Sequence, residues 1–213
     1  DVDDLESGEA ADPASDEGDL VAVEGILGGI PEHKVQRVMD DNEEAVLECY
    51  ADALDNYDYL EGSLEMAITV DLDGSVYKAF LRGGSLGSQE AESCILGKIR
   101  RFQFPKPGGG RAEVSHSISL YPPHDPPQVL DWSGDQINQV VEAQSADVER
   151  CLGGRTGVQL TVYVEVGGRV VSAGATGDDL GAYEAGSCLA KAAAAWVFPD
   201  PGKRQTAKAS ISF

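Results

Sequence analysis

Two segments of the chain share one pattern of apolar and polar positions. Each begins with apolar residues at helical spacing. Two runs that alternate between apolar and polar residues follow, then a second helical segment and a last alternating run. Alternation with a period of two is typical of half-buried strands, and apolar residues three to four apart are typical of helices. The pattern predicts the element order α-β-β-α-β, repeated once, and an α+β fold class.

The first copy is expected to begin with a helix near Pro31, since proline suits the first turn of a helix. Asp73-Gly74 is a common hairpin turn and separates two predicted strands. A second helix follows, with Ser85 or Ser88 as its N-cap, and it ends before Pro105. The predicted strands of this copy cover about 64–72, 75–81 and 112–120.

The stretch Ser93–Gly110, SCILGKIRRFQFPKPGGG, recurs as Ser187–Gly202, SCLAKAAAAWVFPDPG. Both versions keep Ser-Cys, one aromatic residue and Phe-Pro-x-Pro, which predicts a stretch that ends a helix and fills a small core. The predicted division of the chain is an acidic tail with a short apolar segment at 1–30, a first domain at 31–121, a proline-rich linker at 122–128 and a second domain at 129–213.

Four cysteines lie at equivalent places, two in each copy. They are too widely spaced for a CxxC metal or redox motif. We therefore predict the disulfides Cys49–Cys94 and Cys151–Cys188, each joining the two helices of one copy; the alternative is four buried free thiols. Disulfides would place the protein in an oxidising compartment, so we expect an exported chain in the periplasm, the outer envelope or outside the cell.

The net charge of −21 makes binding to nucleic-acid phosphates or to anionic lipid improbable. Residues 1–20 hold nine acidic residues and no basic one, a composition typical of a solvated tail. No run of apolar residues is long enough to span a membrane, and no calcium-binding loop sequence is present. These features favour a partner that is a protein.

The chain offers few groups for catalysis or metal binding. Its three histidines, His33, His116 and His124, are isolated from other metal-ligating residues in the sequence. No nucleophile motif, P-loop or dinucleotide-binding motif is present. We therefore predict a protein that is not an enzyme and that has no cofactor and no metal.

Small open sheets present unpaired edges to which another strand can be added. The candidate edges are the third strands, at 112–121 and 206–213, and the run Leu20–Ile30 is a candidate strand for donation to a neighbour. Trp132 is a candidate interface anchor, with simple packing as the alternative. The candidate partner-binding residues are Ala22, Val114, Ile118, Ala209, Ile211 and Trp132.

A set of short motifs in the first copy resembles the AgmX/PglI C-terminal domain, a relative of the TonB C-terminal domain. The motifs are Cys49-Tyr50, Asp73-Gly74, Leu86-Gly87, Ser93-Cys94, Arg100-Arg101-Phe102, Phe104-Pro105 and Pro107–Gly110. In the second copy Leu152 replaces the tyrosine, Ala194-Ala195 replaces the basic pair, and the glycine run is broken.

The resemblance implies two tandem TonB-C-like domains in the cell envelope and a non-enzymatic role. Binding of a partner, including another copy of the chain, by strand addition is the function that we expect first. The alternative is a TonB-like coupling or gliding-motility module that transmits force across the envelope.

Overall fold

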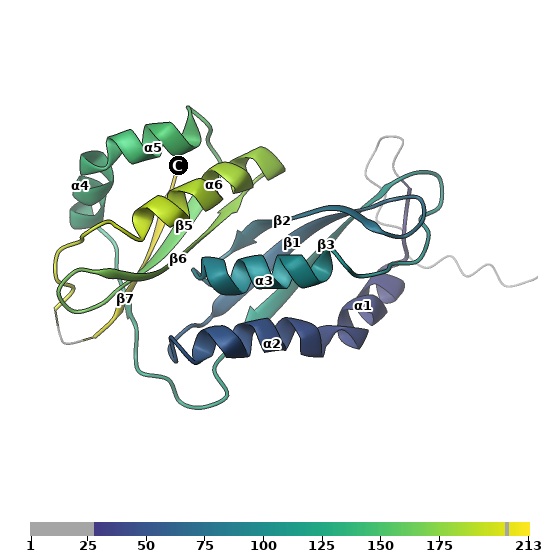
Figure 1. Ribbon diagram of the computed structural model, residues 1–213, viewed down its shortest axis with the longest axis horizontal. Helices are drawn as coiled ribbons and strands as arrows, with labels where there is room; N and C mark the ends of the chain where they lie inside the picture. The colour runs from purple at the N-terminus through teal and green to yellow at the C-terminus, as the bar shows by residue number, and fades with distance from the viewer. Residues whose placement is uncertain (1–27, 203–204) are drawn as a thin grey trace, which may run out of the picture.

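The computed structural model describes residues 28–202 and 205–213, and it is an α+β structure with two sheets (Figure 1). In the first copy the strands lie in the order β2-β1-β3, all antiparallel. Its elements are α1 (Glu32–Asp41), α2 (Glu43–Leu54), β1 (Gly62–Val70), β2 (Val76–Gly84), α3 (Gln89–Ile99) and β3 (Ala112–Leu120). This sheet has the three antiparallel strands that the sequence predicted.

The second copy has a four-stranded sheet with the order β4-β7-β5-β6, so the prediction of three strands was wrong here. Its elements are β4 (Leu130–Asp131), α4 (Asp135–Ala143), α5 (Ser145–Leu152), β5 (Val158–Val164), β6 (Val170–Gly177), α6 (Leu180–Ala193) and β7 (Ala207–Ser212). The added strand, β4, is only two residues long and runs parallel to β7. Such a short strand carries no alternating pattern by which a sequence could reveal it.

The first predicted helix of each copy is in fact two helices. The first copy breaks at Asn42 and the second at Gln144, which lies 102 residues later, the same separation as Cys49 and Cys151. At Asn42 the side-chain amide donates a hydrogen bond to the carbonyl of Val38, at 2.8 Å. Asparagine often competes with the helix backbone in this way. The break gives α1 and α2 separate directions along the edge of the sheet.

Both predicted disulfides are present. Cys49–Cys94 joins α2 to α3, with the two Cα atoms 5.7 Å apart, and Cys151–Cys188 joins α5 to α6, with the Cα atoms 5.5 Å apart. Each therefore ties together the two helices that cover one face of a sheet. In each copy the apolar residues of that face form the main core.

The two copies also pack directly against each other through their sheets' outer faces. Tyr163 of β5 is fully buried in the first copy's core cluster, and its hydroxyl donates a hydrogen bond to the carbonyl of Glu61 at 3.1 Å. In the opposite direction, Tyr183 of α6 lies against Phe80 of β2, with ring centroids 6.4 Å apart. Each sheet is therefore covered on one face by its own helices and on the other, in part, by the other copy.

Candidate functional site

The four outer edges of the two sheets have different surroundings. The edge strands β2 and β6 lie next to each other where the two copies meet. Strand β7 has β4 on its outer side, opposite Ala207 and Lys208. Strand β3 has, on its outer side, only an isolated bridge between Gly28 and its first residue, Ala112. Of its nine residues, eight therefore have no strand partner on that side within the described part of the chain.

The sequence predicts an open edge at the third strand of each copy, and for the second copy this prediction is wrong in part. The segment before α4 pairs with Ala207 and Lys208 of β7, through β4. The backbone N–H of Trp132 extends the pairing by donating to the carbonyl of Lys208, at 2.8 Å. The prediction failed because a sequence read in order does not show that a linker returns to the last strand.

The outward side chains of β3 are small or acidic. Glu113, Ser115, Ser117 and Ser119 are all exposed. Proteins commonly protect an open edge with lysine, proline or a bulge. The register of β3 against β1 runs without a shift from Gly62 to Val70, and the strand contains neither lysine nor proline. Nothing in the strand itself opposes the addition of another one.

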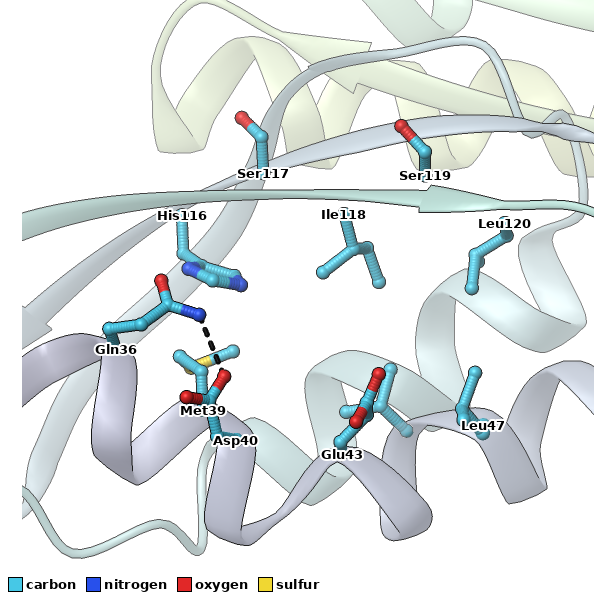
Figure 2. Close-up of a pocket in the computed structure, with 11 residues that line it drawn as sticks. Gln36, Met39, Asp40, Glu43, Leu47, His116, Ser117, Ile118, Ser119 and Leu120 are labelled. Carbon is cyan, nitrogen blue, oxygen red and sulfur yellow. Dashed lines mark hydrogen bonds between the residues drawn. The ribbon is translucent and has the colours of Figure 1, made fainter.

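A groove of about 300 Å³ lies between β3 and the helices α1 and α2 (Figure 2). His116, Ile118 and Leu120 point from β3 into the groove, whereas Ser117 and Ser119 point the other way. The facing side chains come from both helices, so the break at Asn42 helps to form the opposite wall. They are Gln36, Met39, Asp40, Glu43, Val46 and Leu47.

The floor of the groove is apolar and its helical rim is acidic. Met39 and Val46 are buried, whereas Leu47 is 44% exposed. Asp40 accepts a hydrogen bond of 2.7 Å from the Gln36 amide, shown dashed in Figure 2. No lysine or arginine is among the described residues that line the groove.

His116 lies at one end of this groove. Burial lowers the pKa of its imidazole, and the nearby carboxylate of Asp40 offsets part of that effect. A histidine whose pKa is lowered from about 6.5 is mainly neutral at pH 7. Its side chain therefore adds a polar but uncharged group to the groove.

The sequence-predicted partner residues fall into three different settings. Val114 and Ile118 lie half-buried on the groove side of β3. Ala209 and Ile211 are buried in the second core, and Trp132 packs within the second copy against Phe198, with ring centroids 5.9 Å apart. Position 22 lies outside the described residues. β4 pairs with Ala207 and Lys208 alone, so Ala209 and Ile211 also lie on an edge without a strand partner among the described residues, but of these candidates only Ile118 lines the groove described above.

The last residues of the predicted donor segment Leu20–Ile30 are held within the first copy. Ile30 is 6% exposed and belongs to the first core, and Gly29 forms an isolated bridge with Gly108. The backbone N–H of Gly28 donates to the carbonyl of Arg111, at 2.7 Å. Residues 28–30 are therefore part of the first copy, and the rest of the segment lies outside the described residues.

A buried carboxylate that was not predicted from the sequence lies where the two copies meet. Glu92 of α3 is 3% exposed. Its carboxylate accepts hydrogen bonds from the backbone N–H groups of Gly87 (3.0 Å) and Ser88 (3.2 Å) and, across the contact, from that of Ala175 (3.2 Å). A Cβ atom at Gly174 would collide with this carboxylate. The acid therefore occupies the space that a side chain at position 174 would fill.

Burial raises the pKa of Glu92 to about 7, although the three backbone N–H groups favour the charged form and oppose that shift. The motif alignment places Glu92 opposite Gly186 in the second copy. A charged residue in one copy and a glycine in the other, both on otherwise apolar helix faces, is the signal that could have identified the position. We treat Glu92 as a structural group of the contact between the copies, because it does not line the groove.

Two other features bear on function. Among residues 28–202 and 205–213, no group of three or more His, Cys, Asp or Glu side chains is placed to hold a metal ion. No described helix is both long and apolar enough to cross a membrane. The histidine of the groove, His116, accordingly has no neighbouring set of ligands in the part of the chain that is described.

Comparison of the chain with protein-family models, curated proteins and solved structures found no match in any of the three. The resemblance to the AgmX/PglI C-terminal domain therefore stays a prediction from sequence motifs.

Proposed function

We propose that the protein is a non-enzymatic interaction protein of the cell envelope or the extracellular space. It binds an extended segment of another protein along the outer side of β3. The observation that carries this proposal is the long unpaired edge of β3, which stands directly beside a groove with an apolar floor. An edge strand supplies backbone hydrogen bonds, and a neighbouring groove supplies selectivity for alternate side chains.

The geometry suits a strand better than a helix or a small molecule. Side chains of an added strand alternate between the two faces of the sheet, as those of β3 do. Every second side chain of the added strand would lie over the groove, next to Ile118 and Leu120. The others would lie beside Ser117 and Ser119 on the opposite face. The exposed surface of Leu47 would be covered in the process.

The two disulfides are compatible with an oxidising compartment, where such bonds persist. The motif resemblance leads to the same expectation for the location.

A photocrosslinking experiment tests the proposal with a control inside the same molecule. Ser117 and Ser212 are equivalent, because they lie opposite Glu65 of β1 and Gln159 of β5, 94 residues apart. Both serines are exposed. The variants Ser117→p-benzoylphenylalanine and Ser212→p-benzoylphenylalanine would be illuminated in the cells that make the protein. Crosslinked products would then be identified by mass spectrometry.

We expect a defined crosslinked protein from position 117 and none from position 212. Hydrogen exchange at residues 113–120 should slow when that protein is added in purified form. A product made of two copies of this chain would identify self-assembly as the form that the interaction takes. Equal crosslinking from both positions, or none from position 117, would contradict binding at the β3 edge.

A further inference from the structure

We infer that the segment bound along β3 carries a basic side chain between apolar ones, and that it comes from a different protein. This inference rests on the proposed function and names the chemistry of the partner. Strand addition by itself does not specify the side chains of the bound segment. The charges around the groove do.

The groove combines an apolar floor with two acidic residues on its helical side. Figure 2 shows the carboxylates of Asp40 and Glu43 on the side chains that face β3. Among the ion pairs of the described residues, none includes either of them. An added strand would place a side chain between these carboxylates and the floor formed by Met39, Val46 and Ile118. Lysine and arginine fit such a place, because their aliphatic stems cover apolar surface while the cationic end reaches the rim.

The second copy lacks this combination. The equivalents of Asp40, Glu43 and Leu47 lie 102 residues later and are Glu142, Ser145 and Glu149. The exposed leucine of the groove is thus replaced by an acid, and one of the two rim acids by a serine. The combination of two rim acids with an exposed leucine is a property of the first copy alone.

The charge of the chain argues against its own N-terminal segment as the occupant. Residues 20–27 contain Glu24 and no basic residue, and nine acids precede them in residues 1–19. Inserting this segment into the groove of a second molecule of this chain would bring like charges together at the acidic rim. Each molecule of the chain carries a net charge of −21, which opposes the association of two molecules.

The position of Gly28 gives a second, geometric reason. Gly28 pairs in the parallel sense with Ala112, the first residue of β3. Gly29 then pairs with Gly108 instead of continuing along β3, and Ile30 belongs to the first core. Residues 28–30 of the chain therefore leave the edge at 113–120 free for a segment of another chain.

Three synthetic peptides of nine residues test the inference. They have threonine at every odd position and valine at positions two, six and eight, and they differ only at position four, which is lysine, glutamine or glutamate. Binding to the full chain would be measured by fluorescence anisotropy at 50 and 300 mM salt. Hydrogen exchange at residues 113–120 would verify where each peptide binds.

We expect the lysine peptide to bind about three- to fivefold more tightly than the glutamine peptide, and the glutamate peptide to bind most weakly, as for exposed ion pairs. The differences should shrink at 300 mM salt because the charges are screened. The variant Asp40→Asn/Glu43→Gln should remove the preference, so that the three peptides bind with equal affinity. The matched variant Glu142→Gln in the second copy should have no effect.

The outcomes separate this inference from the proposed function. Equal binding of the three peptides at β3, or a preference for glutamate, overturns the basic partner and leaves strand addition in place. A crosslinked product that proves to be a second copy of this chain also overturns the inference but supports the proposed function. Failure of all three peptides to protect residues 113–120 overturns the inference, and if position 117 also gives no crosslink, the proposed function fails with it.

Discussion

The outer strands of the two sheets are equivalent in position but differ in what lies next to them. Ala112 of β3 and Ala207 of β7 are paired with equivalent residues of the central strands, Val70 and Val164. On the outer side Ala112 faces Gly28, and Ala207 faces Leu130. In both copies the segment just before the first helix thus contacts the start of the outer strand, and we call this segment the entry point. It forms a short strand in the second copy and a single bridge in the first.

The residues at this entry point account for the difference. The second copy has Leu130, Asp131 and Trp132, whose side chains can cover an edge, and the indole of Trp132 packs on Phe198. The first copy has Gly28, Gly29 and Ile30, and only the last has a side chain beyond hydrogen. A Cβ atom at Gly28 would collide with the carbonyls of Gly108 and Gly110. Close packing against that loop therefore requires glycine, and glycine leaves the rest of the edge uncovered.

The disulfides provide the largest expected effect and test whether the copies are coupled. Their sequence separations are 45 and 37 residues, so removing either is expected to lower the free energy of unfolding by about 4 kcal/mol on the chain-entropy model. Both tryptophans, Trp132 and Trp196, belong to the second copy. Tryptophan fluorescence during denaturation should therefore shift in Cys49→Ser/Cys94→Ser as much as in Cys151→Ser/Cys188→Ser. If the tryptophan transition of Cys49→Ser/Cys94→Ser were the same as that of the unaltered protein, the two copies would unfold independently.

The second prediction concerns the buried carboxylate of Glu92, for which the second copy has only Gly186. The folded-state pKa of about 7 lies above the ordinary value of 4.5, so the folded protein binds this proton more tightly than the unfolded chain does. The resulting stabilisation is fully present below pH 4.5 and is lost as the pH rises through 7. The total change is about 3 kcal/mol, at about 1.4 kcal/mol for each pKa unit.

The variant Glu92→Gln isolates this contribution from the other titrating groups. The amide cannot ionise. The free energy of unfolding should therefore fall by about 3 kcal/mol less between about pH 4.5 and 7 in this variant than in the unaltered protein. Chemical denaturation at a series of pH values in this range would measure the difference. Parallel pH profiles for the two proteins would show that burial does not raise the pKa of Glu92.

The third prediction concerns the part of the β7 edge that β4 covers, at Ala207 and Lys208. Trp132→Ala removes a half-buried indole from the contact with Phe198 and should lower the free energy of unfolding by about 2 kcal/mol. Hydrogen exchange at Lys208, whose backbone faces β4, should become faster, because β4 loses the side chain that anchors it. The equivalent variant Ile30→Ala also removes buried apolar surface but should leave exchange at β7 unchanged. Unaltered exchange at Lys208 in Trp132→Ala would mean that the backbone pairing holds β4 without the indole.

The repeated pattern was enough to predict the main strands and both disulfides, because alternation and cysteine position are local or pairwise signals. It was not enough for β4, which is set by the return of a linker to a distant strand. The helix breaks at Asn42 and Gln144 were missed because the apolar spacing continues through them. For the candidate site, Val114 and Ile118 could be predicted from the alternation of β3. The facing wall could not, since Asp40 and Leu47 are exposed helical residues whose neighbours depend on how α1 and α2 lie against the sheet.

The smallest expected effect on stability comes from Leu47, and it bears most directly on the difference between the copies. Leu47 is 44% exposed in the groove, and its equivalent in the second copy is Glu149. The variant Leu47→Gln gives this position a neutral side chain of the length of Glu149. Substitutions at exposed helical positions usually change stability by less than about 0.5 kcal/mol. Affinity for a peptide bound along β3 should nevertheless fall about tenfold, because an apolar side chain that becomes covered on binding is lost.

The matched change Glu149→Gln should alter neither quantity. If Leu47→Gln binds as well as the unaltered protein, the partner does not enter the groove, and the edge of β3 would then have to act through its backbone alone.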